Sequence, residues 1–275
     1  DGIIFFSLTQ IYSGQHIFGG LAPAWSLCTE LTFYLFLPVY AWLVQRWRAG
    51  WPRLRVELLG VAALYVGSGV FRIVMSSRGY GLSNDWLPSY LDVFALGMLL
   101  AVVSVAVERG MAGQWWSLVP RDAAVWWAAA LALFIAVSNL GMPMAIVDVS
   151  PAKYFTHHLL AGTIGALIVC PAVLHDNAGG LIRQVLSSRP LRALGVISYG
   201  IFLWHVPWIF QVEKWTGGHA YFADFWPVLF WAVVLTLLSA WLTYVLIERP
   251  LLTSRPRERG GSGVAAAIPS GTAAE

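Results

Sequence analysis

Residues 21–38 read LAPAWSLCTELTFYLFLP, a hydrophobic and aromatic segment with a single acid, Glu30, in its interior. Placing a carboxyl group in lipid costs at least about 2.5 kcal/mol even on lenient insertion scales. The segment therefore predicts a membrane helix, and its acid is a candidate functional residue. The alternative is a structural role, in which Glu30 hydrogen-bonds backbone at a kink caused by Pro38.

The composition extends this interpretation to the whole chain. Of 275 residues, 58% are hydrophobic and 11% are charged, with a mean hydropathy of +0.68, whereas soluble domains carry roughly 25% charged residues. We expect an all-α, polytopic transmembrane helix bundle forming one domain over residues 1–253, and a disordered cytoplasmic tail over 254–275. Because a helix needs about 20 residues to cross the bilayer, seven stretches are candidate spans: 24–44, 57–74, 90–107, 123–140, 155–174, 194–212 and 225–247.

The basic residues predict the orientation of these spans. Thirteen of the 17 Lys and Arg residues lie in alternate loops, which places those loops and the C-terminus in the cytoplasm of a cell-membrane protein. The start of the chain is then external, so we expect the chain to be the C-terminal part of a larger protein. Outside the connecting loops there is no basic run, which argues against nucleic-acid binding, and the two cysteines lack metal-ligand spacing.

Ionisable residues gather at the external ends of the predicted spans. Glu30, Arg72, Asp92 and His205 all fall in this leaflet, as does the pair at 157–158, which predicts a polar cavity opening outward. A carboxylate and an imidazole from separate helices are suited to acid–base work near neutral pH.

Helical spacing adds two serines to these faces. Ser26 lies four residues before Glu30, and Ser198 lies seven before His205, so each shares a helix face with its neighbour.

Each of these residues also has a structural interpretation. Arg72 and Asp92 would form a simple ion pair at the membrane edge, or Asp92 would be a favourable charge at a helix N-terminus. His157 and His158 would be solvated at the interface, and His205 would hydrogen-bond between helices.

Four segments, taken together, resemble a known family. WSLCTELTFYLFLP (25–38), LDVFALGMLLA (91–101), SYGIFLWHVPW (198–208) and LIERPLL (246–252) are similar, in order and spacing, to motifs of the membrane acyltransferase-3 family. The resemblance spans roughly residues 3–252. That family O-acylates lipopolysaccharide O-antigens, nodulation factors, peptidoglycan and macrolides. It has ten membrane helices, and its first helix carries an Arg and a His that no segment of this chain matches.

The resemblance implies a membrane O-acyltransferase that moves an acyl group, often acetyl, from acyl-CoA to a hydroxyl of a sugar-containing acceptor. No cofactor or metal is expected beyond the acyl-CoA co-substrate. The residues that match the family's motifs are Trp25, Ser26, Glu30, Tyr34, Asp92, Ser198, His205 and Glu248. From these we expect catalytic roles for Glu30 and His205 and substrate contacts from Trp25, Ser26, Tyr34, Asp92 and Ser198. Arg72 joins the substrate-binding candidates because of its position at the outer end of its span. Two alternatives remain open: an inactive paralogue that only binds the acceptor, and an exporter of acylated small molecules.

Overall fold

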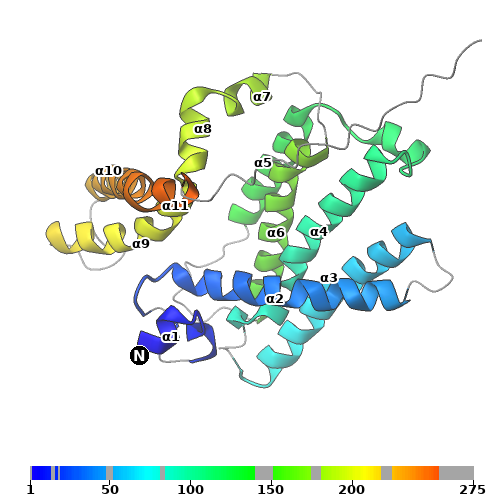
Figure 1. Ribbon diagram of the computed structural model, residues 1–275, viewed down its shortest axis with the longest axis horizontal. Helices are drawn as coiled ribbons and strands as arrows, with labels where there is room; N and C mark the ends of the chain where they lie inside the picture. Colours follow the sequence, from blue (N-terminus) through cyan, green and yellow to red (C-terminus); the bar gives the residue numbers. More distant parts are fainter. Residues whose placement is uncertain are drawn as a thin grey trace, which may run out of the picture.

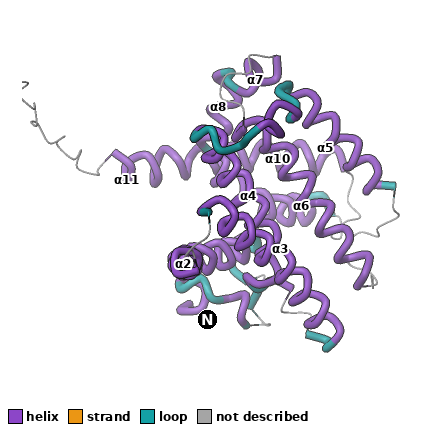
Figure 2. Tube along the Cα trace, turned by 90° about the vertical axis from the view of Figure 1, so that its right-hand side faces the viewer, coloured by secondary structure: helices purple, strands orange, loops and turns teal. Residues whose placement is uncertain are grey.

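The computed structural model describes residues 2–13, 16–17, 19–47, 52–80, 84–139, 151–174, 181–217 and 225–253. Throughout these ranges the regular structure is helical and no strand occurs (Figures 1 and 2). The fold prediction of an all-α bundle is therefore confirmed. The predicted disordered tail, 254–275, lies outside the described residues.

Helices occupy all seven stretches predicted as spans. In chain order the elements are α1 (Gly2–Phe6), η1 (Gln10–Tyr12), α2 (Ala24–Trp47), α3 (Arg53–Ser77), α4 (Leu87–Glu108), η3 (Gln114–Leu118), α5 (Ala123–Ser138), α6 (Pro151–Leu174), α7 (Leu181–Leu186), α8 (Arg189–Val196), α9 (Ser198–Trp215), α10 (Phe225–Thr243), the π-helical turn η4 (Tyr244–Glu248) and α11 (Arg249–Thr253).

Length and hydropathy distinguish the candidate membrane spans from the other helices. Among the described residues, five helices are long and apolar enough to cross a membrane: α2, α3, α4, α6 and the continuous run from α10 to Thr253. A sixth span results if α8 and α9, which meet at a 70° bend, are counted together. The remaining predicted span, 123–140, corresponds to α5, which has 16 residues. At 1.5 Å per residue it is roughly 24 Å long, shorter than a ~30 Å hydrocarbon core.

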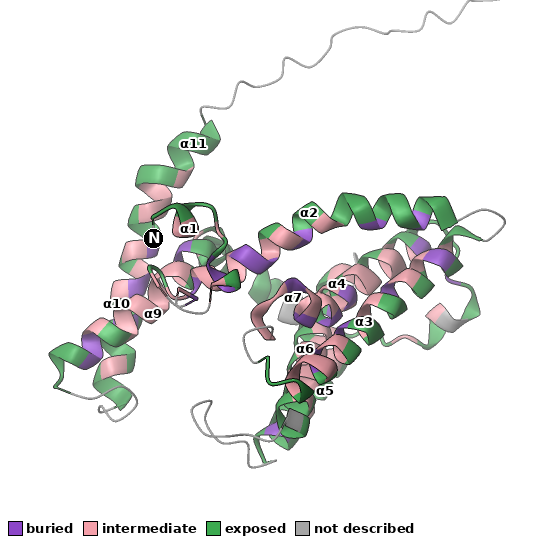
Figure 3. Ribbon diagram, turned by 90° about the horizontal axis from the view of Figure 1, so that it is seen from below, coloured by how far each residue is buried: buried purple, intermediate pink, exposed green. Residues whose placement is uncertain are grey.

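The helices form two groups. Helices α3, α4, α5 and α6 pack side by side, and α2 lies across α3 and α4 (Figure 1). Helices α9 and α10 form a separate antiparallel pair, seen at a distance from α3–α6 in both Figure 1 and Figure 3.

Figure 3 shows exposed residues along helices of both groups. Large apolar residues are among those exposed, for example Leu35, Phe134 and Trp241. A soluble protein would bury such surface, so these faces suit contact with lipid.

Close backbone packing holds α9 against α10. Gly200 faces Ala240, and a Cβ at Gly200 would lie 2.8 Å from the Ala240 Cα. Small residues let membrane helices approach in this way.

Two indoles then bridge the same helix pair. Trp204 Nε1 donates to Thr243 Oγ1 at 3.0 Å, and Trp208 Nε1 donates to Ser239 Oγ at 2.9 Å.

Candidate functional site

The most strongly connected polar cluster lies where α3, α4 and α6 meet. Arg72 comes from α3, Asp92 from α4 and His158 from α6, and the first two are only 1% and 2% exposed. His158 Nε2 lies 3.1 Å from Asp92 Oδ1 and 2.9 Å from Oδ2. Arg72 Nη2 lies 3.1 Å from the same imidazole nitrogen. The histidine thus connects a buried cation to a buried acid.

The two neighbours of His158 make opposite demands on its Nε2. An arginine nitrogen only donates and an ionised carboxylate only accepts, so Nε2 cannot satisfy both neighbours at once. Two carboxylate oxygens lie at 2.9 and 3.1 Å from it. A proton on Nε2 would donate to Asp92, whereas a bare Nε2 would accept from Arg72.

The Asp92 carboxylate is itself held in place. The backbone N–H of Val93 donates to Asp92 Oδ1 at 2.9 Å, and the residue lies in the first turn and a half of α4. This backbone donor and the imidazole together supply partners for a charge that would otherwise be buried alone, at high cost.

Arg72 is enclosed by aromatic rings and by the start of α4. Its Nη2 donates to the carbonyl oxygen of Ser89, and its guanidinium carbon lies 5.6 Å from the Tyr90 ring centroid and 5.8 Å from that of Tyr154. Both distances are within the range of cation–π attraction.

Some buried donors in this region have no partner among the described residues. They are Nε and Nη1 of Arg72 and, four residues earlier on α3, the hydroxyl of Ser68. A buried polar group without a partner is costly, so water or a polar ligand would be favoured here.

The charge of Arg72 also affects the pKa of an acid outside the spans. Asp85, in the loop before α4, has its pKa raised by burial, while the Arg72 charge acts in the opposite direction. Thr29 of α2 donates to the Asp85 carbonyl oxygen at 3.1 Å. The loop thus connects the beginning of α2 to the Arg72 cluster.

Of the candidate residues from the sequence, Arg72 and Asp92 lie close together in the structure. They are connected by His158, which was not among the candidate site residues. The expected simple ion pair between them is not what the structure shows, because His158 lies between the two. Sequence reasoning treated His158 as a solvated interfacial residue, whereas its side chain is only 13% exposed. The sequence feature that could have identified His158 was its position at the outer end of the predicted span 155–174, level with Arg72 and Asp92.

Glu30 lies on α2, away from hydrogen-bonding partners. It is half-buried, and within the described residues its carboxyl group makes no hydrogen bond or ion pair. The helix continues unbroken through Pro38, so the alternative in which Glu30 binds backbone at a kink is not seen.

The other candidates on α2 have local partners. The Trp25 ring lies 5.8 Å from Tyr90, next to the Arg72 cluster. Ser26 donates to the Pro23 carbonyl oxygen at 3.2 Å, and Tyr34 is 62% exposed.

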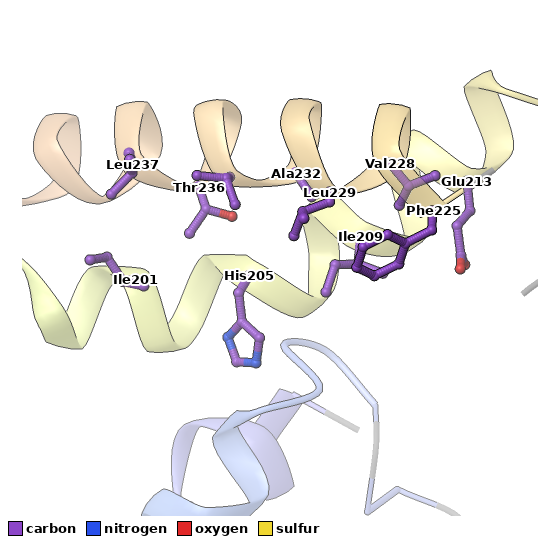
Figure 4. A pocket seen from close by; sticks show the side chains of 11 residues that line it. Ile201, His205, Ile209, Glu213, Phe225, Val228, Leu229, Ala232, Thr236 and Leu237 are labelled. Carbon is purple, nitrogen blue, oxygen red and sulfur yellow. The ribbon is translucent and has the colours of Figure 1, made fainter. Parts of the chain in front are cut away.

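His205 lies in the separate α9–α10 pair. Its Nδ1 donates to the Phe202 carbonyl oxygen at 2.7 Å, a bond within its own helix rather than between helices. It lines a cavity of about 420 Å³ with residues of α9 and α10, chiefly apolar, and in Figure 4 its imidazole points away from α10.

No hydrogen bond joins His205 to Glu30 in the described part of the chain, so their joint catalytic role stays a prediction. Ser198 at the start of α9 is exposed, and Glu248 in η4 is half-buried. A metal centre is not indicated either: the described ranges contain no group of three or more potential ligands.

This arrangement, a polar cluster enclosed by apolar helices long enough to cross a bilayer, defines a polytopic membrane protein with a candidate acid–base site. Comparison with known proteins then specifies the family. The model of the acyltransferase domain family matches residues 2–245, and the chain belongs to that family. No solved structure gives a significant match.

Three curated relatives illustrate the similarity. The chain is 28% identical to Nodulation protein 10 of Rhizobium leguminosarum bv. viciae, covering 89% of this chain and 59% of that protein. It is 36% identical to the putative peptidoglycan O-acetyltransferase YrhL of Bacillus subtilis (86% and 36%) and 25% identical to the O-acetyltransferase OatA of Staphylococcus aureus (87% and 37%). The chain therefore spans between about one third and three fifths of the length of these relatives.

Proposed function

We propose that this protein is an integral membrane O-acyltransferase that transfers an acyl group, often acetyl, to a hydroxyl of a sugar-containing acceptor. The observation that carries the proposal is the family match, which extends over 2–245 and so includes every helix that packs around the polar cluster. Two of the relatives described above are named as O-acetyltransferases of bacteria, one of them of peptidoglycan.

The donor we propose is acyl-CoA. An acyl thioester is activated toward attack by a hydroxyl, but the hydroxyl needs a base to remove its proton and donors to stabilise the oxyanion. The described helices contain both kinds of group close together, namely an imidazole with a free nitrogen and a guanidinium with unpaired N–H groups.

The proposed orientation has the C-terminus in the cytoplasm of a multi-pass cell-membrane protein. By the charge rule, Arg189 and Arg192 of α8 and the basic residues that follow α2 lie on one side of the membrane. That side would meet cytosolic acyl-CoA, while the Arg72 cluster would lie toward the opposite leaflet.

The transfer reaction is tested with the whole protein in membrane vesicles. Vesicles receive acetyl-CoA labelled in the acetyl group and peptidoglycan fragments as acceptor, and the ester is identified by its release with mild base. Labelled O-acetylated glycan is expected from vesicles that carry the protein and not from matched empty vesicles. Absence of product with several acyl-CoA chain lengths and several glycans would reject the proposal.

A further inference from the structure

We propose that α8 lies in the membrane interface and binds the headgroups of anionic phospholipids through Arg189 and Arg192. The face of α8 that carries Leu191 and Leu194 enters the edge of the hydrocarbon layer. This inference goes beyond acyl transfer and does not depend on it, because it rests on the direction, exposure and charge of α8.

The first argument is the direction of α8. Helix α9 packs antiparallel to α10, and the run from α10 to Thr253 is long and apolar enough to cross a membrane. With 18 residues, α9 is roughly 27 Å long at 1.5 Å per residue, close to the ~30 Å hydrocarbon core. Helix α8 meets α9 at a 70° bend (Figure 1). When α9 crosses the bilayer, α8 therefore runs along the membrane surface rather than through it.

The second argument is the exposure of α8. Every residue from Arg189 to Val196 is exposed, and the helix buries none of its side chains. The exposed fractions include 37% for Leu191 and 39% for Leu194. A helix of eight residues is marginal by itself in water. Contact with a surface outside the chain would stabilise it.

The third argument is the arrangement of side chains around α8. Arg189 and Arg192 are three positions apart and share one face of the helix. Leu191 and Leu194 are also three apart, and at about 100° per residue their face lies nearly opposite the arginines. Helices with one basic face and one apolar face lie in the plane of the membrane interface. Their arginines extend toward the headgroups while the methylene groups rest on apolar surface.

The charge of the segment favours an anionic lipid. Residues 181–197 include three arginines and no acid. Within the described part of the chain, neither Arg189 nor Arg192 has an ion pair or a hydrogen bond from its side chain. Guanidinium groups form bidentate hydrogen bonds with phosphate. On the proposed cytoplasmic side, the leaflet carries anionic lipids.

Coenzyme A also carries phosphates, but it has no hydrocarbon to cover the leucine face. A phospholipid offers a phosphate to the arginines and an acyl chain to the leucines. The two faces of α8 together therefore favour a lipid as the partner.

The depth of α8 is tested with nitroxide labels on the whole protein, in nanodiscs of equal parts phosphatidylglycerol and phosphatidylcholine. The native Cys28 and Cys170 are buried, so the label reacts at an introduced cysteine. A label in Leu194→Cys should relax faster with oxygen, which concentrates in lipid, than with a water-soluble nickel complex. A label in Arg192→Cys should show the reverse. Preference for the same reagent at both positions would overturn the proposal, since α8 would then lie wholly in water or wholly in the hydrocarbon core.

The choice of lipid is tested by cross-linking in the same nanodiscs. Photoactivatable phosphatidylglycerol and phosphatidylcholine with identical acyl chains are compared, and the label on α8 is quantified by mass spectrometry. A basic residue near an anionic surface contributes about fivefold in affinity. Replacing both arginines, Arg189→Gln with Arg192→Gln, should therefore lower the ratio of phosphatidylglycerol to phosphatidylcholine labelling about 25-fold.

The matched control is Arg53→Gln at the start of α3. Arg53 is also exposed and lies 3.9 Å from Glu57, and by the charge rule it is on the same side of the membrane as α8. This variant should leave the labelling ratio of α8 within twofold of wild type. A fall of less than threefold in the double variant would overturn the proposal. Equal labelling of wild-type α8 by both lipids, with loss of label on adding coenzyme A, would also overturn it and would assign the arginines to a soluble phosphate.

Discussion

The contact between α9 and α10 at Gly200 gives a stability prediction that can be worked out from the structure. In Gly200→Ala the new Cβ would lie 2.8 Å from the Cα, 2.9 Å from the Cβ and 3.2 Å from the carbonyl oxygen of Ala240. Carbon atoms prefer separations of about 3.5–4.0 Å. Two of these atoms are backbone, so the helices themselves must move apart by roughly 0.6–1 Å.

The expected loss of stability in Gly200→Ala is the sum of three contributions. Overpacking costs about 1–3 kcal/mol. The two flanking indole bonds, Trp204 to Thr243 and Trp208 to Ser239, would stretch past good geometry, and interhelical hydrogen bonds in membranes average about 0.6 kcal/mol each. Alanine regains about 1 kcal/mol of helix propensity. The net expectation is a loss of about 1–3 kcal/mol, because the last two contributions nearly cancel.

The assay measures the thermal midpoint of the purified protein in one detergent, with fluorescence-detected size-exclusion chromatography as the readout. At about 2–4 °C per kcal/mol for chains of this size, Gly200→Ala should lower the midpoint by roughly 2–12 °C. Gly165→Ala in α6 is the matched control, because nothing lies within 4 Å of its added Cβ, and it should hold or slightly raise the midpoint. If both variants shift in the same direction, the close approach of α9 and α10 is not what governs stability.

Three further predictions concern charge and topology. Glu30→Gln should lower acyl transfer at least tenfold with normal expression if this acid orients a substrate or a base; near-normal turnover would remove it from the site. Burial raises the pKa of Asp85, so the folded state binds a proton more readily than the unfolded state, and stability should increase as the pH falls through the folded-state pKa toward the lower, unfolded-state pKa. In Asp85→Asn, thermal midpoints measured across the same pH range should no longer rise at low pH. A pH profile identical to that of the wild type would show that Asp85 is not the group responsible. A fluorescent protein fused after Thr253 should fluoresce, whereas an alkaline phosphatase fusion there should be inactive; the reverse pattern would invert the proposed topology.

Local patterns were sufficient to predict the helices but not their mutual angles. An apolar run of about 20 residues implies a membrane helix wherever it occurs, because backbone groups in lipid must bond within their own segment. This explains why 24–44, 57–74 and 90–107 fall inside α2, α3 and α4. The bend of 70° between α8 and α9 was not predicted, since 194–212 reads as one apolar run although α8 begins earlier at Arg189.

In the candidate site, too, some features could be predicted from the sequence and others depended on helix packing. The sequence alone predicted a helical membrane protein, because this property depends on composition and on the length of the apolar runs, and its four motifs carried the resemblance to the acyltransferase family. Position along each predicted helix also predicted that ionisable groups gather toward one leaflet. Only the tertiary structure decided that His158, and neither Glu30 nor His205, connects Arg72 to Asp92. Which side chains meet depends on the rotation of each helix about its axis and on the crossing angles of α3, α4 and α6, and these are set by packing between segments up to 86 residues apart.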